Sequence, residues 1–157
     1  MVSREEIRRI VHQLRQQGKK IVLANGCFDL IHVGHVRYLR EAKQAGDVLV
    51  VAGNSDTSVR KLKGKGRPLM GERERAEIVD SFEFVDYVFI FEEDNVKQIL
   101  RELRPHFHAK GGDYTPETVP EREVAAQVGA KVIITGGGKV ESTSSIIERI
   151  KRTFGKG

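Results

Sequence analysis

Two histidines separated by two residues are the strongest chemical signal in the sequence. His32 and His35 follow an apolar run at residues 21–24, and a helical pattern begins beside them near Val33. Residues three apart share one face of a helical turn. A helix start offers unbonded N–H groups and the positive end of the helix dipole, and imidazoles can donate hydrogen bonds as well. This combination predicts a site that binds a phosphate chain.

Alternative chemistry for the two histidines is less well supported. They could form half of a metal site completed by Cys27, His106 or His108. Zinc needs three or four ligands at a recognisable spacing, and the sequence has no second pair of that kind. We therefore expect no protein-bound metal. Cys27 could be a nucleophile, although a small residue packed at a strand end is the simpler interpretation.

Two glycine-containing segments further along the chain are also candidates. Residues 110–114 read Lys-Gly-Gly-Asp-Tyr, in which glycines would let the backbone approach a base or a phosphate, and Asp113 could bind ribose hydroxyls or a cation. Residues 136–139 read Gly-Gly-Gly-Lys but lack the Ser or Thr of a P-loop, and no GxGxxG is present. Ser142 and Thr143 suit either a helix cap or a grip on a terminal phosphate.

The most basic segment, residues 60–75, allows two interpretations. It carries lysines and arginines broken by Gly64, Gly66 and Pro68, which indicates a mobile loop between two helices. Such a charge run is usually solvated surface. Its position after a strand also fits a loop that folds over phosphates.

The hydrophobic pattern predicts the elements that must hold these residues. Strands are expected at 21–24, 48–52, 87–91, 106–109 and 131–135, with helices between them, one of them capped by Asp94. Continuous apolar strands alternating with helices predict an α/β fold, a Rossmann-like doubly wound five-stranded parallel sheet. The loops at 25–35, 110–114 and 136–145 all follow strands, so they should meet at one edge of the sheet.

Composition limits the class of protein. The chain has 157 residues, a net charge of +5, one cysteine and no apolar run that could span a membrane. We expect one domain over residues 1–157, with a helix at 3–17 packed on it, in the cytoplasm. The positive charge is expected to serve small phosphorylated ligands rather than nucleic acid, because no nucleic-acid motif is present.

The motifs together resemble a known family. His32-Val33-Gly34-His35 resembles the HxGH signature of the nucleotidyltransferase, or cytidylyltransferase-like, superfamily. Within it the chain is similar to the ADP-heptose synthases, the adenylyltransferase part of the bifunctional heptose-phosphate kinase/adenylyltransferases. The matching segments are Asn25-Gly-Cys-Phe-Asp29, Asn54-Ser-Asp56, Lys63-Gly64, Arg67-Pro68, Arg75-Ala-Glu77, Lys110-Gly-Gly-Asp-Tyr114 and Ser142-Thr143. The kinase half is not matched, so the stand-alone form is expected.

The resemblance implies a reaction and a set of roles. ATP and D-glycero-D-manno-heptose 1-phosphate would give ADP-heptose and pyrophosphate by in-line attack on the α-phosphate, with Mg²⁺ on the triphosphate, in lipopolysaccharide biosynthesis. It implies that His32 and His35 stabilise the α-phosphate and that Lys63 reaches the phosphates. The implied nucleotide contacts are Gly26, Cys27, Phe28, Asp29, Gly34, Lys110, Gly112 and Asp113, with Ser142 and Thr143 on the β- and γ-phosphates.

Three alternatives remain open from the sequence. Val140 stands where the family usually has glycine, which bears on the terminal-phosphate loop and on sugar specificity. A cytidylyltransferase acting on glycerol 3-phosphate would share the fold and the HxGH motif. A nucleotide-binding regulatory module would share them without turnover. Relatives commonly form homodimers, so a homodimer is possible for this chain.

Overall fold

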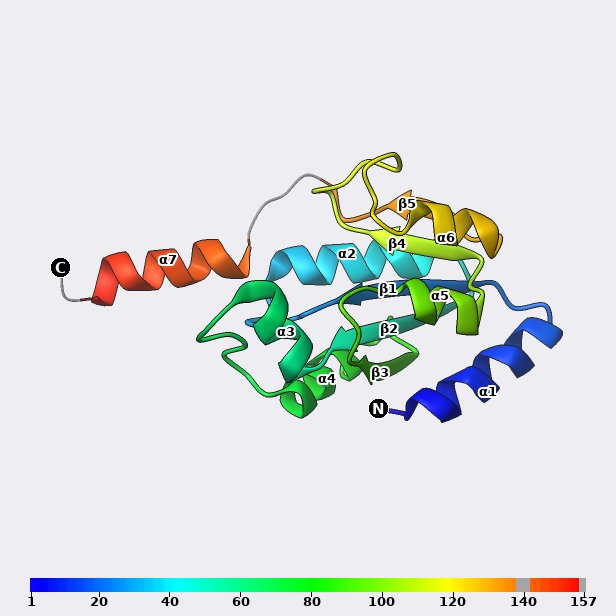
Figure 1. Ribbon diagram of the computed structural model, residues 1–157, viewed down its shortest axis with the longest axis horizontal. Helices are drawn as coiled ribbons and strands as arrows, with labels where there is room; N and C mark the ends of the chain where they lie inside the picture. The colour runs from blue at the N-terminus through cyan, green and yellow to red at the C-terminus, as the bar shows by residue number, and fades with distance from the viewer. Residues whose placement is uncertain (138–141, 156–157) are drawn as a thin grey trace.

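A single parallel sheet forms the centre of the protein. The computed structural model describes residues 1–137 and 142–155, and in this part of the chain the strands form one five-stranded sheet in the order β3-β2-β1-β4-β5 (Figure 1). The strands are β1 (Ile21–Gly26), β2 (Val48–Asn54), β3 (Tyr87–Phe91), β4 (Phe107–Lys110) and β5 (Lys131–Ile134). All the pairings are parallel, which confirms the predicted fold class.

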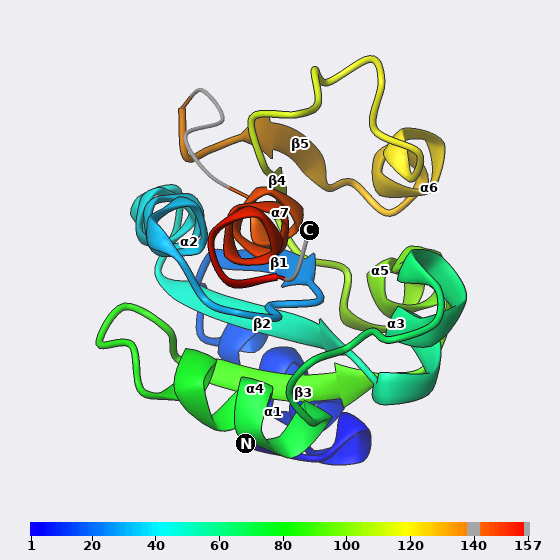
Figure 2. The same ribbon diagram turned by 90° about the vertical axis from the view of Figure 1, so that its left-hand side faces the viewer.

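Helices connect the strands and cover both faces of the sheet. They are α1 (Arg4–Gln16), α2 (Val33–Gln44), α3 (Asp56–Lys63), α4 (Glu72–Asp80), α5 (Lys97–Leu103), α6 (Arg122–Gln127) and α7 (Thr143–Phe154). Figure 2 shows α2 and α4 on one side of the sheet and α1, α5 and α6 on the other. Each side has its own apolar core, because alternate residues of a strand point to opposite faces.

Local sequence signals set most of the helix boundaries. Ser3 and Glu6 form the expected capping box at the start of α1, and Gly18, with φ of 81°, follows its end. The predicted cap at Asp94 is wrong. Helix α5 begins at Lys97, whose N–H donates to the side chain of Asn95 instead.

Helix α7 differs from the others in its surroundings. Ser142 caps it as expected, but none of its described residues is buried. Ile150 is 49% exposed and Phe154 is 80% exposed, and Figure 1 shows the helix extending away from the sheet.

The order of the strands decides where a ligand can bind. The chain leaves β1 on one side and returns through β4 on the other, so the direction of winding changes between these two neighbouring strands. Ligands of open α/β sheets bind beyond the carboxyl ends of the strands at such a switch point. No helix among the described residues has the length and apolar character needed to cross a membrane.

Candidate active site

A cavity of about 690 Å³ opens at the carboxyl edge of the sheet, a size typical of ligand sites. Its walls come from the loops after β1, β4 and β5, which confirms that the three predicted segments converge. The lining includes every predicted site residue: Gly26, Cys27, Phe28, Asp29, His32, Gly34, His35, Lys63, Lys110, Gly112, Asp113, Ser142 and Thr143. Their individual roles remain predictions.

The two histidines are held by the backbone at the start of α2. Nδ1 of His32 accepts a hydrogen bond from the N–H of Gly34 at 3.1 Å, so this side chain caps the helix. Nδ1 of His35 accepts one from the N–H of His32 at 3.2 Å. The two ring centroids lie 3.9 Å apart. Because Nδ1 is an acceptor in both rings, the proton of each neutral imidazole is on Nε2.

His35 is neutral near pH 7. Burial, and to a smaller extent the neighbouring His32, lower its pKa from the ordinary 6.5 to about 4, against the opposing charge of Asp29. A neutral ring can accept a hydrogen bond at Nδ1 and donate one from Nε2 at the same time. The site therefore offers a fixed, uncharged donor for a phosphate oxygen.

The ring of Phe28 packs beside the histidine pair. Its backbone has a positive φ of 54°, and its buried ring lies 5.5 Å from the ring of His35. Gly26 makes room for this ring, since a Cβ at that position would stand 3.2 Å from Cζ of Phe28. A glycine before the HxGH segment is therefore needed to seat the aromatic ring.

Asp29 holds a loop in place. Its buried carboxylate accepts hydrogen bonds from the N–H groups of Leu69 and Met70, at 2.8 and 3.1 Å, and from Nε of Arg67 at 3.1 Å. Its carbonyl accepts from the hydroxyl of Thr143 at 2.5 Å. The residue predicted to contact the nucleotide is thus occupied in anchoring residues 67–70 beside the cavity.

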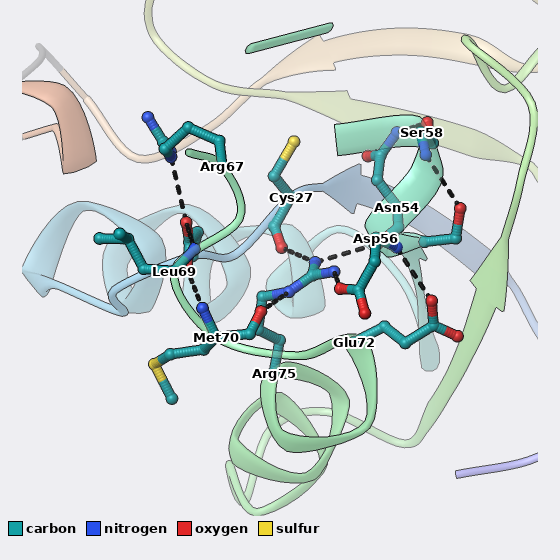
Figure 3. A network of polar contacts seen from close by, with 11 residues as sticks. Cys27, Asn54, Asp56, Ser58, Arg67, Leu69, Met70, Glu72 and Arg75 are labelled. Atoms are coloured by element: carbon teal, nitrogen blue, oxygen red, sulfur yellow. Dashed lines mark hydrogen bonds and ion pairs between the residues drawn. The ribbon is translucent and has the colours of Figure 1, made fainter. Parts of the chain in front are cut away.

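Arg75 corrects the expectation that the charges of residues 60–75 are solvated surface. It is only 2% exposed and stands at the centre of the network in Figure 3. Nη1 donates to the carbonyls of Cys27 and Asn54 at 2.5 and 2.9 Å. Nε donates to the carbonyl of Met70 at 2.8 Å, and Nη2 pairs with Asp56 at 2.9 Å. One side chain therefore joins the ends of β1 and β2 to the loop before α4.

A local signal for Arg75 exists in the sequence. The arginine precedes Ala76 and lies four residues before Val79, so it falls near the apolar face of α4, where a guanidinium must find partners. Spacing alone does not name those partners, because they are backbone carbonyls from other loops.

Cys27 and Lys63 occupy different positions in the cavity wall. The carbonyl of Cys27 faces Arg75, whereas its sulfur points away from that side chain (Figure 3). Burial raises the pKa of the thiol, which does not favour a nucleophile. Lys63 is the last residue of α3 and its side chain is exposed at the cavity, where it can move towards a phosphate.

Lys110 lies at the end of β4 in a buried position that sequence analysis did not anticipate. Its ammonium is 3.9 Å from a carboxylate oxygen of Glu121 and 4.7 Å from the ring centroid of Tyr114. Burial lowers the pKa of Lys110, and the charge of Glu121 acts against that shift. Glu121 also lines the cavity and was missed, because nothing near it in the sequence marks it as more than a loop residue.

Hydrogen bonds between polar groups join β1, β4 and α2 next to the cavity. The hydroxyl of Tyr38 donates to the carbonyl of Ala109 at 2.6 Å and accepts from the N–H of Asn25 at 3.2 Å. Nε2 of His108 lies 2.9 Å from the side-chain oxygen of Asn25. Burial lowers the pKa of His108 to about 3, so this ring is also neutral. These contacts bridge β1, β4 and α2 at the switch point.

The glycine segment after β5 passes close to α2. Gly136 has φ of 92°, and a Cβ there would stand 3.0 Å from Cα of Tyr38. Its N–H donates to the carboxylate of Glu41 at 2.7 Å. The interpretation of residues 138–141, including Val140, falls outside the described residues.

No cluster of three or more metal-ligating side chains occurs within residues 1–137 and 142–155. The cavity wall carries imidazoles engaged through Nδ1, ammonium groups and hydroxyls, which suit phosphate oxygens, together with the carboxylates of Asp29, Asp94, Asp113 and Glu121.

Comparison with known proteins agrees with this geometry. The family model described as "Cytidylyltransferase-like" matches residues 23–155, a range that includes most of β1, the two histidines and α7. The chain belongs to the cytidylyltransferase-like family. Membership confirms the predicted nucleotidyltransferase superfamily, which implies a nucleotide substrate and usually a divalent metal.

Individual relatives are similar over nearly the whole chain. The bifunctional protein HldE of Pelobacter propionicus is 48% identical over 152 residues, which are 97% of this chain and 31% of that protein. The bifunctional protein HldE of Geobacter metallireducens is 48% identical over 147 residues, 94% of this chain and 30% of that protein. The chain thus spans less than a third of the length of these relatives.

One solved structure is also similar. The crystal structure of the lipopolysaccharide core biosynthesis protein from Thermoplasma volcanium GSS1 superposes with a TM-score of 0.65 and 27% identity. The match covers 75% of this chain and 97% of the other. The fold therefore has a counterpart in a protein named for lipopolysaccharide core biosynthesis.

Proposed function

We propose that the chain is an adenylyltransferase that moves AMP from ATP to D-glycero-D-manno-heptose 1-phosphate, with release of pyrophosphate. The observation that carries the transfer chemistry is the histidine pair, whose Nδ1 atoms accept backbone hydrogen bonds and leave the proton on Nε2. The motif resemblance and the similarity to proteins named bifunctional HldE support the heptose as acceptor.

The cavity can stabilise charge at an attacked phosphate without a covalent intermediate. The positive end of the α2 dipole lies at the cavity, and His32 and His35 supply Nε2–H donors. Lys63 lines the cavity wall and brings positive charge towards a triphosphate. In this proposal Mg²⁺ travels with the triphosphate and offsets part of its charge.

Attack by the sugar phosphate needs alignment more than chemical activation. A phosphate oxygen of the acceptor is already anionic near pH 7, so no general base is required. The contribution of the protein is to hold two anionic ligands in line while the donors receive the added charge at the α-phosphate.

The substrate assignment is tested by pyrophosphate release. ATP and CTP would each be offered with heptose 1-phosphate and with glycerol 3-phosphate, and we expect turnover with ATP and the heptose alone. Turnover with CTP would keep the transfer chemistry and overturn the proposed substrates. Nucleotide binding without turnover in all four mixtures would favour a regulatory module.

We also propose that the protein works in the cytoplasm as a homodimer. The exposed Ile150 and Phe154 of α7 support the dimer, because they offer an apolar surface to a second copy. Sedimentation equilibrium of the whole chain and of a Phe154→Ser variant would test it, and a monomeric wild-type protein would contradict it.

A further inference from the structure

Lys110 and Glu121 form a buried pair of opposite charges in the cavity wall. They are 8% and 4% exposed, and both line the cavity. The nearest atoms of their charged groups are 3.9 Å apart, too far for a hydrogen bond. A buried ion pair normally closes into hydrogen-bonded contact, because desolvation of both charges must be offset.

The carboxylate oxygen of Glu121 that faces Lys110, Oε2, makes no hydrogen bond. Oε2 is fully buried and has no hydrogen-bond partner in the described part of the chain. The residue occupies the N-cap position of α6, where a side chain could cap the helix, yet no such bond is made. Leaving a buried carboxylate oxygen unpaired is unfavourable. Because Glu121 lines the cavity, a turn of its side chain would bring this buried oxygen to a donor supplied by a ligand.

Lys110 has hydrogen-bond donors that are not used. Its ammonium has three N–H donors. Among residues 1–137 and 142–155 it contacts the Glu121 carboxylate and the face of Tyr114, and it makes no hydrogen bond. An unused acceptor and unused donors therefore stand side by side in the cavity.

We propose that Lys110 and Glu121 together bind two neighbouring hydroxyl groups of a sugar ring. A hydroxyl both donates and accepts, so one can donate to Glu121 while its neighbour accepts from Lys110. A phosphate only accepts and would be repelled by the carboxylate. The half-buried ring of Tyr114, next to Lys110, offers an aromatic surface to the ring of the sugar.

Two rings in the proposed reaction carry such hydroxyls, the ribose of the nucleotide and the acceptor sugar, so this inference rests on the proposed function. The experiment separates them. Its central variant is Glu121→Gln, which keeps the shape and removes the charge. The matched control is Glu123→Gln, an exposed glutamate two residues further along in α6.

The first arm measures nucleotide binding by calorimetry without an acceptor. ATP is compared with its 2′-deoxy and 3′-deoxy analogues. If the pair binds the ribose, the wild-type protein and Glu123→Gln bind ATP about 10- to 100-fold more tightly than a deoxy analogue, the usual effect of a hydrogen bond to a charged group. Glu121→Gln, whose amide oxygen accepts a weaker, uncharged hydrogen bond, then discriminates much less between the two.

The second arm measures binding of heptose 1-phosphate in the presence of α,β-methylene-ATP. If the pair binds the acceptor, Glu121→Gln weakens this binding about 10- to 100-fold and Glu123→Gln does not. A positive result in either arm supports the inference. Its absence in both arms overturns it. If Glu121→Gln instead no longer distinguished ATP from inosine triphosphate, the pair would contact the base, and the inference would be overturned.

A folding defect is separated from a binding defect by a second variant. Lys110→Met with Glu121→Gln removes both charges, so no unpaired charge remains buried, and thermal melting reports whether it folds. It should fold and still show the binding defect. Pyrophosphate release by the wild-type protein is measured separately. Absence of pyrophosphate release would contradict the proposed reaction. Loss of ligand discrimination in the variants tests only the role of Lys110 and Glu121.

Discussion

Polar groups on the two sides of the cavity are organised in opposite ways. On the β2 side, Arg75 and Asp29 direct their charged groups at backbone and side-chain partners 2.5 to 3.1 Å away. On the β4 side, Lys110 and Glu121 stand 3.9 Å apart with hydrogen-bonding capacity unused. A saturated network fixes the position of a loop, whereas an unsaturated one is suited to a ligand.

The closed network should be the costlier one to break. Arg75→Met would leave the carbonyls of Cys27, Asn54 and Met70 without this donor and the carboxylate of Asp56 unpaired. We expect a loss of about 3–5 kcal/mol in the free energy of unfolding, the usual cost of removing one partner of a buried charge. Urea denaturation measures it. Arg73→Met, an exposed change in the same helix, should cost less than about 0.5 kcal/mol; equal losses would contradict the central role of Arg75.

The histidine pair lies between the two regions and should affect catalysis more than stability. His35→Ala removes a preorganised donor, so we expect kcat for pyrophosphate release to fall about 10²- to 10³-fold. His12→Ala, an exposed histidine of α1, is the control and should keep full activity. A fall in affinity for ATP without a change in kcat would show that His35 binds the ground state alone.

Acid should act through the neutral histidines. The pKa of His35 is about 4 in the folded protein and near 6.5 when unfolded. Below pH 6.5 the unfolded chain takes up a proton that the folded protein does not, so stability is full above pH 6.5 and falls as the pH drops towards 4.

The expected loss from His35 is on the order of 3 kcal/mol. His108, whose pKa burial lowers to about 3, contributes a further loss over the same range below pH 6.5 and continues to do so down to about pH 3. Urea denaturation between pH 7.5 and 4 would measure the loss. The loss in the free energy of unfolding should be smaller in His35→Asn, by about the part that His35 contributes. A wild-type protein whose stability is constant over this range would contradict the assignment.

The open pair should contribute least to stability. Replacing both Lys110 and Glu121, by Met and Gln, removes two desolvated charges together. Because a loosely paired buried ion pair adds little net free energy, we expect the free energy of unfolding to change by no more than about 1 kcal/mol. Urea denaturation beside Arg75→Met gives the comparison directly. A loss as large as that of Arg75→Met would mean that both networks are structural.

Much of the architecture could be predicted because it depends on local pattern. Apolar runs predict the strands, and Ser3 and Ser142 predict helix starts through bonds that span three residues. The rule that parallel strands end at one edge then brings His32, Lys110 and Ser142 to one cavity. Failure at Asp94 shows the limit of local signals, since Asn95, one residue away, could serve the same purpose.

Tertiary structure decided which charges are buried and what they bind. Arg75 and Lys63 belong to one basic segment, yet one is enclosed by carbonyls from other loops and the other is exposed. The partners of Asp29 are about 40 residues away, and Lys110 and Glu121 pair only because a loop returns to the end of β4. Periodicity records which face a residue prefers, whereas desolvation and pairing depend on neighbours that only the folded chain supplies.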